Sequence, residues 1–303
     1  MLQRMELSGG KVVPDGDNGN IYVYVNPDEA ERKYLVGTLK LDEHTLASAL
    51  DPDELARLEF EPDHTAVIFK RPRNYSSDDM FVFRVVSVGL FLFADRLIVV
   101  LSEDIPLFQG KQFTRITTLQ EVALKIIYSS ISHFVEHLRV VSAVSDALEE
   151  QINSSMENKY LLSLFSLEKS LVYYLNGINS NGKLIERLKN SAAKLKLTTG
   201  SIEFVDDMII ENQQCYEQAA TYSNILASMM DARVSIVSNN LNWLIKTLTI
   251  ITIAIMLPTL VVSIFSMNVE FPGKNHPWAF WLIIAIALSS TFVVRLVWRW
   301  KRW

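Results

Sequence analysis

The sequence predicts an α/β domain, followed by long helices and by a transmembrane hairpin of two helices. Three observations predict this fold class. No charged residue lies between Lys246 and Glu270, and a second uncharged run extends from Asn275 to Val294. Each run is long enough for the ~20 apolar residues with which a helix crosses a bilayer. Short strand and helix signals mix over residues 1–118, and long helical patterns follow them.

Charge and cysteine content limit the possible functions. The 303 residues include 29 basic and 34 acidic side chains, a formal net charge of −5 that gives no reason to expect nucleic-acid binding. The only cysteine, Cys215, cannot form an intramolecular disulfide, as expected in a reducing cytosol. The N-terminal segment has no apolar stretch, so the sequence predicts no cleavable signal peptide.

Residues 1–118 are predicted to form a cytosolic α/β domain. Strand signals, rich in β-branched and aromatic residues, occupy 21–25, 65–70, 80–93 and 96–102. Helix signals occupy 27–37, 42–50 and 51–60, with Asp42 and Asp51 as N-caps. The sequence has no glycine-rich phosphate loop and no nucleophile elbow. We therefore expect no enzyme activity.

Residues 119–200 are predicted to form long antiparallel helices, because apolar side chains recur at helical spacing. Gly177 and the Asn-Ser-Asn-Gly at 179–182 are expected to weaken or kink the second of them. Ser201 is the predicted cap of a stalk helix over 201–244, whose pattern continues into the membrane segment. So long a helix needs partners. It belongs either to a plain coiled coil or bundle, or to a stalk that transmits a cytosolic signal.

The C-terminal fifth is predicted to form the membrane part of the protein. It divides into a first transmembrane helix (245–267), an outer loop (268–277), a second transmembrane helix (278–298) and a basic tail (299–303). Basic side chains gather after the second span, whereas the loop has only Lys274 against Glu270. By the positive-inside rule both termini are cytosolic, and the protein is multi-pass.

One face of the first span carries apolar side chains toward its cytosolic end and hydroxyls toward its outer end. The stripe comprises Ile245, Leu248, Thr252, Met256, Thr259 and Ser263. Two interpretations remain open. The stripe can pack against another transmembrane helix. Alternatively, several copies surround an axis, and the stripe lines a wet pore that its apolar rings close by dewetting.

The end of this span carries a motif. Ser266-Met267-Asn268 closes the span, and Met256-Leu257-Pro258-Thr259 lies within it. With the two spans, the short loop and the basic tail, these residues resemble the CorA family of magnesium transporters, whose signature there is Gly-Met-Asn. Residues 235–240 and 246–251 also look like family sequence. The departure is Ser266, which stands where the family has glycine.

The resemblance implies a funnel-shaped homopentamer in the lipid of the cytoplasmic (inner) membrane. It would take up Mg²⁺, with Co²⁺ and Ni²⁺ as surrogates, without an organic cofactor. The family's recognition residue falls on Asn268, beside Met267 and Ser266. Its amide oxygen can accept hydrogen bonds from the waters of hydrated Mg²⁺. Glu270, just outside, would concentrate cations at the entrance.

The resemblance also implies closure by cytosolic Mg²⁺ bound between subunits. An ungapped alignment back from Asn268 places a family stalk aspartate at Asp207, with Asp206 beside it. The alternative is an ordinary acidic start of a helix, which the helix dipole favours.

Three alternatives remain. Retained Met267 favours the magnesium side of the superfamily over a zinc or other transition-metal transporter, because the zinc branch has isoleucine there. A membrane-anchored helical sensor or scaffold that conducts nothing fits the same helices. The His-x-x-Glu-His at 133–137 matches a zinc-protease pattern, but nothing marks a third ligand, so we interpret both histidines as half-buried residues of a long helix.

Overall fold

The computed structural model describes residues 1–14, 19–75, 82–154, 158–267 and 276–301. Asn268 and Glu270 therefore lie outside the described residues. The chain forms two compact units, Met1–Met230 and Asp231–Trp303.

The first unit contains a mixed sheet of seven strands in the order β2-β1-β3-β7-β6-β5-β4. The strands are β1 (Leu2–Ser8), β2 (Lys11–Pro14), β3 (Ile21–Val25), β4 (Arg57–Phe60), β5 (His64–Pro72), β6 (Val85–Phe93) and β7 (Leu97–Leu101). Neighbouring strands are antiparallel except β3 and β7, which are parallel.

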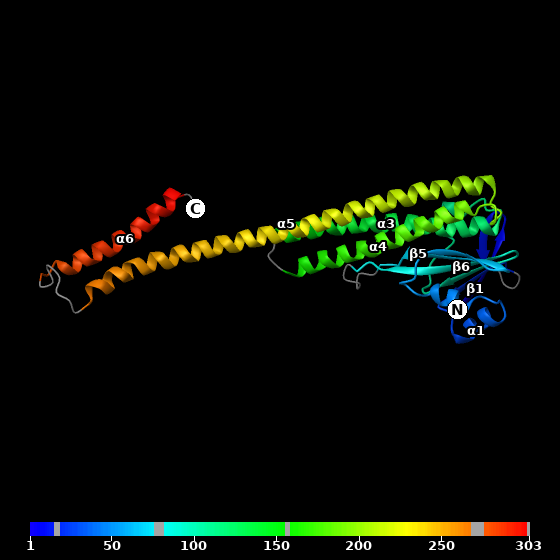
Figure 1. The fold of residues 1–303 in the computed structure, drawn as a ribbon, viewed down its shortest axis with the longest axis horizontal. Helices are drawn as coiled ribbons and strands as arrows, with labels where there is room; N and C mark the ends of the chain where they lie inside the picture. Colours follow the sequence, from blue (N-terminus) through cyan, green and yellow to red (C-terminus); the bar gives the residue numbers. More distant parts are fainter. Residues whose placement is uncertain (15–18, 76–81, 155–157, 268–275, 302–303) are drawn as a thin grey trace. The chain divides into compact units, whose positions relative to one another are not determined.

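Helices cover both faces of this sheet. α1 (Glu29–Gly37) and α2 (Glu43–Ser48) lie on one face, and α3 (Leu119–Ser154) and α4 (Asn158–Asn190) lie on the other. The short η2 (Lys111–Phe113) precedes α3, and the first part of α5 (Thr199–Phe265) packs against α3 and α4. The second unit contains the part of α5 from Asp231 onward, together with α6 (Ala279–Lys301). In Figure 1 the sheet separates α1 from α3 and α4.

The central strand β7 supplies two hydrophobic cores, because successive side chains of a strand point to opposite faces. Ile98 and Val100 join a core with α1 and α2. Leu97 and Val99 join the larger core, to which α3, α4 and the first part of α5 contribute. All five residues of β7 are buried, as the apolar run at 96–102 predicts.

The predicted fold class is confirmed, and so is the cap at Asp42, whose carboxylate accepts the backbone N–H of Thr45 at 2.8 Å. Two predictions are wrong, the helix over residues 51–60 and the cap at Ser201. Residues 51–60 do not form a helix: the Asp51 carboxylate accepts the N–H of Asp53 at 2.9 Å, which closes a turn, and β4 follows. Ser201 is not the cap of α5. The Thr198 hydroxyl takes that place by accepting the N–H of Ser201 at 3.1 Å.

The polar segment of α4 does not interrupt the helix, which continues through Gly177 and residues 179–182. Asn181, fully buried, instead bonds to β5. Its Oδ1 accepts the N–H of Lys70, and its Nδ2 donates to the carbonyl of Lys70, both at 2.7 Å. The neighbouring Ser180 hydroxyl accepts the N–H of Ala56 at 2.7 Å. These side chains satisfy backbone groups beyond the end of β4, where β5 has no strand partner on that side.

Candidate ion path and metal-sensing residues

The stripe predicted on the first span lies in the second unit, on a part of α5 that is exposed to its surroundings. Ile245, Leu248 and Met256 are 54 %, 65 % and 63 % exposed, and Thr252, Thr259 and Ser263 are exposed as well. α5 and α6 are the two described helices that are long and apolar enough to span a membrane. Because no other part of the chain covers the apolar side chains of the stripe, they can contact lipid or another copy of the protein.

Hydroxyl groups on the stripe are oriented by their own helix. Thr252 Oγ1 donates to the carbonyl of Leu248 at 2.9 Å, and Thr259 Oγ1 donates to that of Ile255 at 2.8 Å. A threonine hydroxyl has one proton, so each oxygen presents only lone pairs to its surroundings. The polar part of the stripe is therefore an acceptor surface, which suits cations and their hydration waters.

Ser266 fits the end of α5 without strain. Its N–H donates to the carbonyl of Val262 at 3.0 Å, and its hydroxyl donates to that of Ser263 at 2.9 Å. Among the described residues, those with positive φ other than glycine are Asn26, Lys40, Arg115 and Lys196. Ser266 therefore does not use the left-handed conformation for which a glycine would be needed. Met267 follows with an exposed side chain.

Asp206 and Asp207 lie next to each other on α5 but have different neighbours. Asp206 Oδ1 is 2.7 Å from Lys189 Nζ of α4, and both side chains are half exposed. Asp207 is exposed. Burial and the hydrogen bond to Glu211 raise the pKa of Tyr128 on α3, and the Asp207 charge adds to this effect. Over the described ranges, one chain assembles no group of three or more metal-ligating His, Cys, Asp or Glu side chains.

The two histidines of α3 lie side by side in the first unit, with His137 buried and His133 partly buried. His137 Nδ1 lies 2.6 Å from the Tyr174 hydroxyl, and the two imidazole rings are 4.3 Å apart. Burial raises the pKa of Tyr174, so this phenol stays protonated beside the imidazole of His137. Burial, then the neighbouring His137 and Arg71, lower the pKa of His133 to about 3, and burial and Arg71 lower that of His137 to about 4. The cationic guanidinium of Arg71 close to both histidines, and the lack of a third ligand among the described residues, do not fit a zinc site.

Sequence reasoning did not anticipate the partners that restrict these sites. Lys189, Arg71 and Tyr174 come from parts of the chain distant from the motifs that they contact. The two hydrogen bonds between Asn181 and the backbone of Lys70 were also not predicted, because an Asn-Ser-Asn-Gly run has the composition of a turn.

A family model with the description "CorA-like Mg2+ transporter protein" matches residues 17–301. The chain belongs to this family. The match contains both membrane-spanning helices and the Ser266-Met267-Asn268 motif. The CorA-like chain is therefore a member of a transporter family with two candidate membrane helices at its C-terminal end.

Individual proteins show the same relationship along nearly the whole chain. The cobalt/magnesium transport protein CorA of Methanocaldococcus jannaschii is 24% identical over 292 residues, which cover 92% of this chain and 89% of that protein. The complete structure of the CorA magnesium transporter from the same organism matches with a TM-score of 0.80 at 19% identity, over 98% of this chain and 96% of the other. The full-length CmaX protein matches with a TM-score of 0.74 at 16% identity, over 100% and 98%. These structural matches support the fold.

Proposed function

We propose that this CorA-like chain is a divalent-cation channel that takes up Mg²⁺, and also Co²⁺ and Ni²⁺, across the cytoplasmic membrane. The main support for this proposal is the stripe on α5, whose threonine hydroxyls present hydrogen-bond acceptors. The sequence Ser266-Met267-Asn268 follows directly at its outer end. A relative named a cobalt/magnesium transport protein, which aligns with 92% of the chain, supports the choice of ions. The membrane potential drives the ions inward without ATP.

The path is built from several copies of the chain, and we propose five. Two helices cannot enclose a pore, and the stripe is exposed in the single chain. Around a common axis, Ile245, Leu248 and Met256 form apolar rings that close the path by dewetting. Thr252, Thr259 and Ser263 line its wetter part. The basic side chains at the C-terminal end of α6 support a cytosolic location of both termini by the positive-inside rule.

The outer mouth recognises the hydrated ion. Mg²⁺ loses its waters reluctantly, so a ring of Asn268 amide oxygens binds the hydration shell rather than the bare ion. Ser266 and Met267 set the position of Asn268 at the end of the helix, and Glu270 raises the local cation concentration. The unstrained backbone at Ser266 supports a mouth that tolerates serine in place of glycine.

Cytosolic metal closes the path through Asp207. Asp206 is already paired with Lys189, so a divalent ion there must displace an ammonium group. Asp207 is exposed and better placed to meet an ion at a seam between subunits. Mg²⁺ is thus both substrate and regulator.

The test is metal flux into liposomes that contain the purified protein, with Mg²⁺, Co²⁺, Ni²⁺ and Zn²⁺ compared. We expect Mg²⁺ entry in the wild type, its loss in Asn268→Ala, and its retention in Asn275→Ala, a matched substitution in the same loop. Entry of Zn²⁺ alone would assign a transition-metal transporter. If an intact oligomer conducts none of these ions, the result would favour a membrane-anchored scaffold that conducts nothing.

A further inference from the structure

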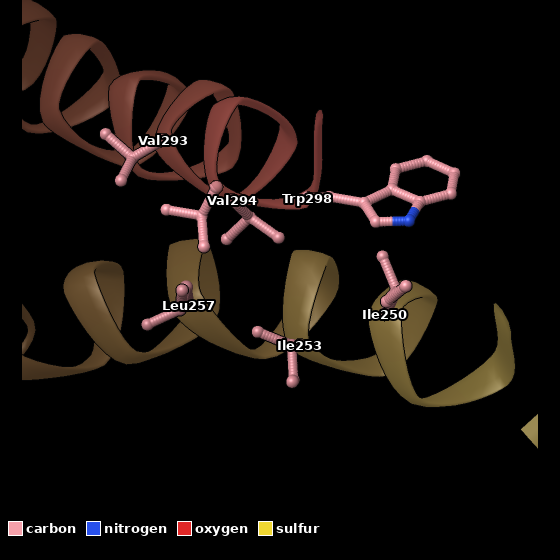
Figure 2. Close-up of a pocket in the computed structure, with 7 residues that line it drawn as sticks. Ile250, Ile253, Leu257, Val293, Val294 and Trp298 are labelled. Atoms are coloured by element: carbon pink, nitrogen blue, oxygen red, sulfur yellow. The ribbon is translucent and has the colours of Figure 1, made fainter. Parts of the chain in front are cut away.

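The two units contain cavities with walls of different chemistry. In the second unit, the groove between α5 and α6 in Figure 2 is lined by isoleucine, leucine, valine and tryptophan side chains. In the first unit, a cavity of about 750 Å³ is lined by the turn between α2 and β4, by β5, by residues around the start of β6 and by one face of α4. This volume is in the range of small-molecule sites. Charged, polar and aromatic side chains line it, so it can select a ligand by its chemistry.

A buried lysine forms part of the cavity wall. Lys70 is 4 % exposed, and its ammonium donates to a backbone carbonyl and to the Ser87 hydroxyl, both at 2.8 Å. Burial lowers the pKa of Lys70, and the charges of Asp51, Asp53 and Glu54 oppose this effect. Asp53 is the acidic residue of the lining. The charges of Lys70 and Asp53 therefore offset each other within the protein.

Two further cations line the cavity. Arg84 precedes β6, and Lys169 belongs to α4. Both side chains are exposed, and neither forms an ion pair within the parts of the chain that the structure describes. The cavity thus keeps two positive charges without a partner. A phosphate monoester carries a charge of about −1.5 to −2 at pH 7, so one such group balances them.

Aromatic side chains lie on both sides of Lys169 along α4. Phe165, Lys169 and Tyr173 are spaced four residues apart, so they share one face of the helix, and all three line the cavity. The Phe165 and Tyr173 side chains are 56 % and 44 % exposed. Lys169 Nζ lies over the Tyr173 ring, 6.0 Å from its centre. The ring of Phe165 is therefore the one that is open to a planar group of a ligand.

We propose that this cavity binds a nucleoside monophosphate, with the phosphate between Arg84 and Lys169 and the base against Phe165. Both parts of such a ligand find a counterpart in the wall. Inorganic phosphate alone leaves the aromatic wall uncovered, and an uncharged nucleoside leaves the two cations without an anion. The Ser166 hydroxyl and the Asn176 amide, which also line the cavity, can bond to the hydroxyls of the sugar. The cavity shares no residue with the stripe of α5, so its occupancy is measured independently of ion flux.

Isothermal titration calorimetry of the full-length protein in detergent tests the proposal, with adenosine monophosphate, adenosine and inorganic phosphate as separate probes. We expect the wild type to bind adenosine monophosphate at least tenfold more tightly than either of the smaller probes, because both parts of the ligand contribute. Phe165→Ala should weaken the binding of adenosine monophosphate about tenfold, as expected for the loss of one stacked base. Leu162→Ala, at an exposed position of α4 outside the lining, should preserve it.

The two cations are tested in the same way. Arg84→Gln and Lys169→Gln should each weaken the binding of adenosine monophosphate about tenfold, because each removes a charge-assisted hydrogen bond to the phosphate. The affinity for adenosine should stay the same in both variants. Arg187→Gln, which changes an exposed cation of α4 outside the lining, is the matched control. Because both cationic side chains are exposed, neither substitution disturbs the core.

Four results would overturn the proposal. The first is a lack of saturable binding of adenosine monophosphate by the wild type. The second is wild-type affinity for it in Phe165→Ala or in both glutamine variants. The third is equal affinity for adenosine monophosphate and inorganic phosphate, which would show a simple anion site. The fourth is binding by dissociated subunits but not by the intact oligomer, which would show that a second copy covers the cavity.

Discussion

At the scale of single residues, Asn181 links α4 to the sheet. Its amide forms two hydrogen bonds to the backbone of Lys70 in place of a neighbouring strand. We expect Asn181→Ala to lower the free energy of unfolding by roughly 2–4 kcal/mol, because it leaves a buried N–H and a buried carbonyl without partners. Asn179→Ala, at an exposed position on the same helix, is the matched control. Chemical denaturation followed by circular dichroism measures the stability of both variants. Equal stabilities would show that the hydrogen bonds of Asn181 to Lys70 contribute little.

The His133–His137 pair makes stability depend on pH. Both folded-state pKa values, about 3 and about 4, lie below the ordinary value of 6.5. The unfolded chain therefore binds more protons between pH 6.5 and about 4, and stability present above pH 6.5 is lost as the pH falls through this window. Between pH 7 and pH 5 we expect a loss of roughly 1–2 kcal/mol for each histidine.

Thermal unfolding at pH 7 and pH 5 checks this expectation, with His133→Gln as the variant and His44→Gln, an exposed histidine of α2, as control. His133→Gln should show a smaller difference between the two pH values than the wild type. The same difference in all three proteins would contradict a role of the His133–His137 pair.

At the scale of elements, α5 is the feature that joins the two units. It starts at Thr199 behind the Thr198 cap and ends at Phe265, next to the motif. We expect Thr198→Ala to destabilise the start of α5 by about 1 kcal/mol, because the Ser201 N–H loses its acceptor, whereas Thr198→Ser keeps the oxygen. Hydrogen exchange of the first turn of α5 reports this change. Faster exchange in the serine variant than in the alanine variant would count against the cap.

At the scale of the whole molecule, periodicity predicted most of the architecture. β3 agrees with the predicted strand 21–25, and the long helices and the apolar hairpin follow from spacing that extends over many residues. Strand β1 and the edge strand β2 were not predicted, because their half-exposed residues lack a continuous apolar run. Residues 51–60 were misassigned because Asp-Pro-Asp is typical of both a helix start and a turn. Tertiary bonds to Lys70 and Ser87 decide between them.

The candidate site was predictable only in part. Side chains within one helix, such as Thr252 and Thr259, can be placed from their spacing. Partners from other elements, such as Lys189 beside Asp206, depend on how α4 packs against α5 and leave no local signal. The same holds for any ligand from a neighbouring copy, which the proposed sensing role of Asp207 requires.

The central claim is that the stripe of α5 faces water in the assembled protein. Cysteine modification tests it directly, since the only native cysteine, Cys215, is buried and burial raises its pKa to about 12, which keeps it unreactive. The measurement compares Thr259→Cys on the stripe with the adjacent Leu260→Cys off the stripe, treated with a charged, membrane-impermeant methanethiosulfonate reagent in proteoliposomes. Rapid modification of Thr259→Cys with loss of Mg²⁺ flux, and slow modification of Leu260→Cys with flux retained, is the predicted result. Equal rates at the two positions, or faster modification of Leu260→Cys, would contradict the ion path proposed for this helix.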